Sequence, residues 1–272
     1  MRSLPLHRHF HAGRVLPALL CALTTGLASP HSQGQDDSGA ESGWVRMGRA
    51  ARHAATAPRT WAPLLGALAL QAGDADRRLQ AWAAEHTPLF GSRTSADHAS
   101  DDLKFAANGL WVVSALAPWQ DEAEGTWLAS KARVLLVEGG AHVVNGATVG
   151  ELKDRTARMR PNGEGATSFP SDHAARVGLH TGMTRSNLEH LGWSDDAQRT
   201  ASVGLDALTG LTAWARVEAN QHYPSDVLAG MALGNFIGVF FTEAFLAPAG
   251  ASDLQVQVQP GPQPQLRVQW RF

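Results

Sequence analysis

The chain has 272 residues, with 23 Lys or Arg against 25 Asp or Glu and a formal net charge of −2 at pH 7. This length allows one domain of roughly 200 to 250 residues with a substantial core, plus a leader and a tail. The mildly acidic balance argues against a nucleic-acid partner, because duplex binding draws on a broad basic face.

Residues 1–31 are typical of a secretory signal peptide. Arg2, Arg8 and Arg14 precede a nearly apolar run over residues 15–28. That run is shorter than the roughly 20 apolar residues that a membrane span requires. We therefore expect a cleaved leader and a periplasmic or secreted protein, with an uncleaved membrane anchor as the alternative.

The only cysteine, Cys21, lies inside this leader and follows Leu20. A lipoprotein signal needs a small residue at that preceding position, which argues against lipidation. The mature protein is then expected to contain no disulfide. Residues 32–43 are small and polar and predict a disordered linker, so ordered structure should begin near Trp44.

Hydrophobic periodicity predicts an all-α bundle of eight or more helices in one domain, residues 44–250. The expected helices cover residues 61–73, 76–86, 103–117, 126 to about 158, 174–191, 201–220 and 224 to about 247. The most apolar stretch, residues 227–247, includes Asn235 and Glu243, and we interpret it as a buried core helix. A membrane span is the alternative interpretation.

The C-terminal tail, residues 251–272, has a different pattern. Apolar residues alternate with Gln on both sides of a PGPQP turn, which predicts a β-hairpin packed on the bundle.

Three motifs between residues 153 and 226 carry the chemistry. Lys153 is followed after six residues by Arg160-Pro161, then by the Pro170-Ser171-Asp172-His173 segment. The third motif follows at the end of a predicted helix and contains Arg216, His222 and Asp226.

Together the motifs resemble the signature of the type 2 phosphatidic acid phosphatase (PAP2) superfamily, K-x6-R-P, P-S-G-H and S-R-x5-H-x3-D. Bacterial nonspecific acid phosphatases and vanadium haloperoxidases belong to this superfamily. Nine residues match at the same relative spacing. Asp172 departs from the family Gly, and Ala215 departs from the family Ser.

The resemblance implies a metal-independent phosphatase that hydrolyses a phosphate monoester or diphosphate through a phosphohistidine. His222 would be the nucleophile, and His173 would be the general acid. Asp226 would accept a hydrogen bond from the second ring nitrogen of His222 and fix its tautomer.

The phosphate would be bound by Lys153, Arg160 and Arg216, because three convergent cations can surround the oxygens of a phosphoryl group. Ser171 and the backbone N–H of Asp172 would bind it at a helix N-terminus. We expect the Asp172 carboxylate to point away from the phosphate, while Ala215 removes one donor.

Neighbouring charged residues have plainer interpretations. Arg155 and Arg158 are expected to form a solvated basic face. His142 and His180 are interpreted as hydrogen-bonded core residues, because no further metal ligand lies at suitable spacing. We expect the loop at residues 162–169 to line the entrance to the site.

Two other functions remain open at this point. One is a non-catalytic binder of phosphate or a lipid headgroup, motivated by Asp172 and Ala215. The other is a vanadate-dependent haloperoxidase, which would use vanadate as cofactor, whereas a phosphatase would need no cofactor and would be inhibited by vanadate. The expected partner is a phosphorylated small molecule or lipid, with membrane-surface association as a further expectation.

Overall fold

The computed structural model describes residues 43–120, 125–246, 254–259 and 265–270. The predicted signal peptide and nearly all of the predicted linker lie outside these residues. Over residues 43–120 and 125–246 the regular secondary structure is helical, as predicted. The helices are α2 (Gly43–Thr56), α3 (Pro58–Ala69), the 3-10 turn η1 (Ala72–Asp74), α4 (Ala75–His86), α5 (Arg93–Leu116), α6 (Trp127–Thr156), α7 (Asp172–Glu189), α8 (Asp195–Glu218) and α9 (Pro224–Phe245).

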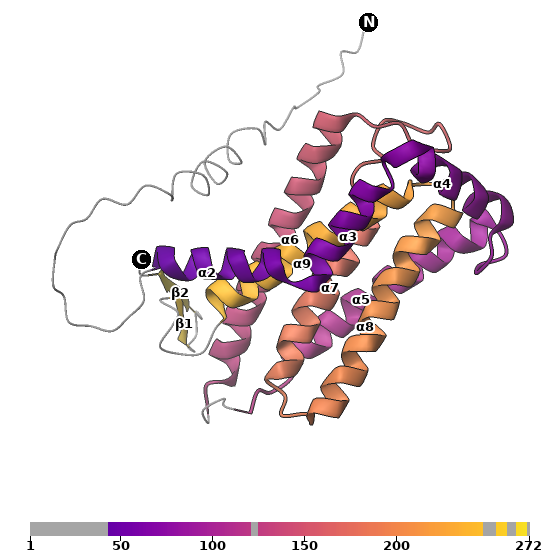
Figure 1. Cartoon of the computed structure of the whole chain (residues 1–272). Coiled ribbons are helices and arrows are strands. Elements are labelled where there is room, and N and C mark those ends of the chain that lie inside the picture. The colour runs from indigo at the N-terminus through magenta and orange to yellow at the C-terminus, as the bar shows by residue number, and fades with distance from the viewer. Residues whose placement is uncertain (1–42, 121–124, 247–253, 260–264, 271–272) are drawn as a thin grey trace, which may run out of the picture. The chain divides into compact units, whose positions relative to one another are not determined.

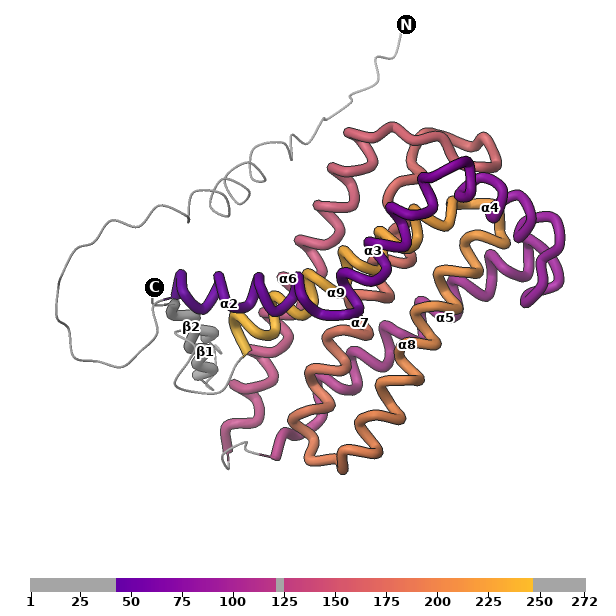
Figure 2. Tube along the Cα trace, in the orientation of Figure 1, coloured from indigo at the N-terminus to yellow at the C-terminus, as the bar shows by residue number. Residues whose placement is uncertain are grey.

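Helix α7 is the centre of the packing. It lies beside α9, and α5 and α8 pack against it and against each other, as Figures 1 and 2 show. The approach of α7 to α9 is close because of glycine. A Cβ atom on Gly234 would lie 2.0 Å from the carbonyl oxygen of Ala175, and one on Gly230 would lie 2.6 Å from that of Ser171.

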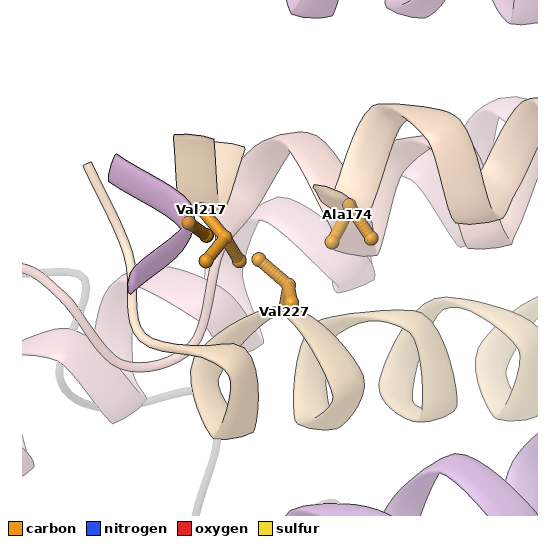
Figure 3. Close-up of a cluster of buried hydrophobic side chains, with 5 residues drawn as sticks. Ala174, Val217 and Val227 are labelled. Atoms are coloured by element: carbon orange, nitrogen blue, oxygen red, sulfur yellow. The ribbon is translucent and has the colours of Figure 1, made fainter. Parts of the chain in front are cut away.

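A small apolar cluster holds together the three helices that carry residues of the second and third motifs. Figure 3 shows Ala174 of α7, Val217 of α8 and Val227 of α9 meeting in it. Each directly follows a residue that the sequence assigned to the site, namely His173, Arg216 and Asp226. Burial of this cluster therefore fixes where the motif side chains emerge.

Helix α5 begins ten residues before the predicted start at residue 103. Ser92 caps it by accepting a hydrogen bond from the N–H of Ser95 at 3.0 Å. The first half is polar and shows no apolar period, which is why periodicity missed it. As described below, these polar residues contact the site.

Helix α9 is the one helix, among the described residues, long and apolar enough to cross a membrane by length and composition. It packs against α2, α3 and α7. Asn235, one of its polar residues, donates to Thr60 of α3 at 2.9 Å.

Near the C-terminus, β1 (Leu254–Gln259) pairs antiparallel with β2 (Gln265–Trp270). Val256 lies opposite Val268 in this register. The turn at residues 260–264 and the end of the tail lie outside the described residues. The hairpin packed on the bundle therefore stays a prediction.

Candidate active site

His222 lies at the corner between α8 and α9, and its side chain is 2% exposed. Its Nδ1 atom is 2.7 Å from the carbonyl oxygen of Ser168. Because a carbonyl only accepts, Nδ1 carries the proton and Nε2 keeps its lone pair. Burial, followed by the charges of Arg216, Lys153 and Arg160, holds the pKa of His222 well below its ordinary value. The ring is therefore neutral near pH 7, as a nucleophile must be.

The predicted hydrogen bond between His222 and Asp226 is wrong. The Asp226 carboxylate is 3.9 Å from His222 Nδ1, beyond hydrogen-bonding distance. This fully buried carboxylate instead accepts from the Ser168 hydroxyl at 2.6 Å, and from the Tyr223 N–H at 2.9 Å. Asp226 thus caps the start of α9 and holds Ser168, whose carbonyl fixes the His222 tautomer.

The prediction that Arg158 belongs to a solvated face is also wrong. Its guanidinium donates to Asp226 at 2.6 Å and to Asp76 at 2.7 Å. It also lies over the ring of Tyr223, with 4.3 Å between the guanidinium carbon and the ring centroid. Arg155, by contrast, is 72% exposed and pairs with Glu151 on the same helix, as predicted.

Thr167 holds two of the predicted phosphate-binding cations. Lys153, in the last turn of α6, donates to the Thr167 carbonyl at 2.6 Å. Arg160 donates to the Thr167 hydroxyl at 3.2 Å and to the side chain of Gln221 at 2.5 Å. Burial, followed by the charge of Arg160, lowers the pKa of Lys153. Because Ser168 comes next in the chain, one short segment fixes both cations and His222.

Beyond the predicted position of residues 162–169 at the entrance, the end of this loop has a structural role that the sequence did not indicate. Ser168 is completely buried, and its N–H donates to the Arg158 carbonyl at 2.9 Å. Its hydroxyl and carbonyl serve Asp226 and His222, as described above. The end of the loop is therefore part of the scaffold of the site.

Arg216 lies in the last turn of α8 and is 5% exposed. One terminal nitrogen donates to Asp97 at 2.5 Å and to Ser100 at 3.0 Å, both on α5. Its Nε atom is buried and has no hydrogen-bond partner in the described part of the chain. A buried N–H without an acceptor is costly, and a phosphate oxygen would satisfy it.

The N-terminus of α7 supplies a second unsatisfied donor. Ser171 is the N-cap residue, yet its side chain caps no N–H, and the buried Oγ has no partner among the described residues. The Asp172 carboxylate pairs with Arg176, one turn further along the helix, at 2.8 Å. Asp172 is thus held along α7, which leaves the free N–H groups of the first turn for an anion.

His173, in the first turn of α7, contacts α5. Its Nε2 atom lies 2.9 Å from a carboxylate oxygen of Asp101 and 2.9 Å from the ammonium nitrogen of Lys104. Burial, followed by the charge of Arg216, lowers the pKa of His173, whereas the hydrogen bond to Asp101 raises it. A general acid must be protonated, so a bound phosphate dianion would have to offset this lowering.

Sequence reasoning missed the contribution of α5. The residues concerned are Asp97, Ser100, Asp101 and Lys104, and their spacing of three and four places them on one helical face. A polar stripe with that period was the available indication. The same polar stripe is equally typical of a solvated helix face, so it does not by itself indicate a site.

Of the two histidines that the sequence predicts to lie in the core, His180 is buried, and His142 is half-buried beside it. His142 Nδ1 and His180 Nε2 are 3.2 Å apart, and the ring of Trp111 stacks on His180 with 5.0 Å between centroids. Within the described ranges, no group of three or more His, Cys, Asp or Glu side chains could hold a metal ion.

Comparison with known proteins gives a match to a family model and similarity to two proteins. The PAP2 superfamily model matches residues 133–247, a range that includes all three motifs. A lipid A 1-phosphatase from Porphyromonas gingivalis is 29% identical over 106 residues, which cover 39% of this chain and 22% of that protein. A transmembrane PAP2 type phosphatidylglycerolphosphate phosphatase from Bacillus subtilis is 20% identical, covers 68% of this chain and 92% of its own, and has a TM-score of 0.49.

Proposed function

We propose that this protein hydrolyses a phosphate monoester or diphosphate through a phosphohistidine, because the PAP2 superfamily model matches residues 133–247, as the motifs predicted. The observation that carries the proposal is the state of His222. Its Nδ1–H is held by Ser168, so Nε2 has a free lone pair, and the charges of Lys153, Arg160 and Arg216 act on the ring.

In the first step, His222 Nε2 attacks phosphorus, and the bond from phosphorus to the leaving oxygen breaks. His173 gives its proton to that oxygen. Lys153, Arg160 and Arg216 would stabilise the charge on the equatorial oxygens, with Ser171 Oγ and the first N–H groups of α7 as further donors. The two buried donors without partners, Ser171 Oγ and Arg216 Nε, support this arrangement.

In the second step, His173 takes a proton from water, and the water oxygen attacks the phosphohistidine. Inorganic phosphate leaves, and His222 is restored with its lone pair. No metal ion is needed in this scheme, because cationic side chains supply the charge stabilisation.

The direct test is a chromogenic phosphate ester assayed with an excess of chelator. The account predicts turnover that the chelator leaves unchanged, that vanadate inhibits, and that His222→Ala abolishes. Wild-type turnover by the His222→Ala variant would refute the nucleophile. Binding of phosphate without turnover on any ester would instead favour the non-catalytic binder.

For the substrate class we propose a lipid-linked phosphate. One similar protein is a lipid A 1-phosphatase, and an apolar groove of about 450 Å³ lies between α3 and α9. Leu64, Ala67 and Leu68 of α3 line it, together with Arg158 and Ser225 from the network around Asp226. Leu64 and Leu68 are 46% and 62% exposed, so this apolar wall also faces outward.

A variant pair tests this substrate class. Leu68→Ser is expected to lower hydrolysis of a phosphatidate in mixed vesicles several-fold while leaving the chromogenic ester unaffected. Val203→Ser on α8 is the matched control, because Val203 is exposed to a similar extent, at 68%. Equal effects of the two variants on the vesicle substrate would refute the groove as a lipid site.

A further inference from the structure

One face of α5 contacts two site residues that lie on different helices. Asp97 and Ser100 bond to Arg216 of α8, while Asp101 and Lys104, one turn later, contact His173 of α7. None of these four side chains belongs to the three motifs. The first pair holds a cation in place, whereas the second pair meets a group that must exchange a proton.

The geometry at His173 involves three atoms in mutual contact. Nε2 is 2.9 Å from Asp101 Oδ1 and 2.9 Å from Lys104 Nζ, and these two charged atoms are themselves 2.8 Å apart. A carboxylate accepts a hydrogen bond from Nε2–H, whereas an ammonium donates only to an unprotonated Nε2. The two contacts therefore favour opposite protonation states of the same ring atom.

We propose that Asp101 and Lys104 are positioning residues that set the proton affinity of His173 in opposite directions. Asp101 stabilises the protonated ring, the form that donates to the leaving oxygen. Lys104 stabilises the unprotonated ring, the form that accepts a proton from water. The inference rests on the proposed role of His173 as acid and base. It assigns support of the proton-donating step to Asp101 and support of the proton-accepting step to Lys104.

The surroundings of His173 are consistent with this assignment. The charged groups that act on its ring are Asp101 and Lys104 from α5 and Arg216 from α8. Arg216 opposes protonation, so Asp101 is the one group among them that favours it. Lys104 and His173 hold the pKa of Asp101 at about 2, which keeps it ionised throughout the working range.

The test is a titration of the His173 ring by NMR in the ligand-free protein. Asp101→Asn should lower the pKa of His173 and Lys104→Met should raise it, each by about one unit. Asp101 is 58% exposed, so solvent screening keeps the effects at this modest size. Asp102→Asn is the matched control, because it removes the same charge from an exposed position one residue away, and it should leave the titration nearly unchanged.

Shifts in the same direction for both variants, or no shift beyond that of Asp102→Asn, would overturn the inference. The titration needs no turnover, so it stands apart from the proposed function. The same variants should move the alkaline limb of the kcat profile in the same two directions. A limb that stays fixed while the ring titration moves would remove His173 from the acid role and leave its control by α5 intact.

Discussion

At the scale of single residues, the side chains packed behind His222 fix the state of this predicted nucleophile. Ser168 is the clearest case, because its carbonyl fixes the His222 tautomer while its hydroxyl donates to the buried Asp226. Arg158 pairs with both Asp226 and Asp76 of α4 and so links the two carboxylates. A buried carboxylate is tolerated only when such donors satisfy it.

Replacing Arg158 by Gln should therefore destabilise the protein strongly. The change leaves Asp76 and Asp226 without their shared cation, and breaking a buried pair of this kind costs about 3 kcal/mol or more. Urea unfolding of the variant measures the loss, and turnover should fall with it.

Arg155→Gln is the matched control, three residues away on the same segment. Its pair with Glu151 is exposed, so the free energy of unfolding should change by less than about 0.5 kcal/mol. If Arg158→Gln and Arg155→Gln lower the free energy of unfolding equally, the buried network around Asp226 does not stabilise the fold as predicted.

At the scale of elements, the contact of α7 with α9 sets the site. Gly230 and Gly234 allow the backbones to approach closely enough for Ser171 and Asp226 to meet, and the N–H of Ser171 donates to the Asp226 carbonyl at 3.0 Å. A side chain at either glycine would have to push the helices apart. The spacing of the motif residues depends on this contact.

Gly234→Ala should accordingly destabilise the fold by about 1 to 3 kcal/mol, because the new Cβ atom meets the Ala175 carbonyl. Gly204→Ala on α8 is the control, since a Cβ atom there meets nothing within 4 Å. The control should be neutral or stabilising by up to about 1 kcal/mol, because Ala is the better helix former. Thermal unfolding of both variants checks the pair, and a tolerated Gly234→Ala would contradict the close-contact account.

At the scale of the whole molecule, buried titratable groups make stability depend on pH in mild acid. Burial raises the pKa of Glu138 to about 7, so Glu138 favours the folded protein as pH drops, whereas His180 acts in the opposite direction. Burial, followed by His142 and Arg176, lowers the pKa of His180 from 6.5 to about 4. Between these values the unfolded chain binds a proton that the folded protein excludes. The contribution of His180 to the free energy of unfolding therefore falls by up to about 3 kcal/mol as pH drops from 6.5 to 4.

Urea unfolding across this pH range tests the prediction. His180→Leu removes this contribution, so between pH 6.5 and 4 its free energy of unfolding should fall less, or rise more, than that of the wild type. His98→Leu, at an exposed position of α5, should keep the wild-type slope. An unchanged slope in His180→Leu would contradict the prediction.

The sequence could predict the helical class and the motif residues, because each has a local signature. Periodicity located most helices, and three motifs with fixed spacing located Lys153, Arg160, Arg216, His173 and His222. The polar first half of α5 has no apolar period, so neither the helix nor its contacts with the site could be found that way. Arg158 and Ser168 depend on partners from α4 and α9, and single-chain spacing contains no information about such partners.

The central claim is that His222 carries the phosphoryl group during turnover. The most direct measurement is rapid quenching at alkaline pH with a substrate labelled with ³²P in the transferred phosphoryl group, followed by peptide mapping. The account predicts an acid-labile label on the peptide that contains His222, absent from His222→Ala and chased by water at the rate of turnover. Label on another residue, or steady turnover with no labelled enzyme at any time, would contradict it.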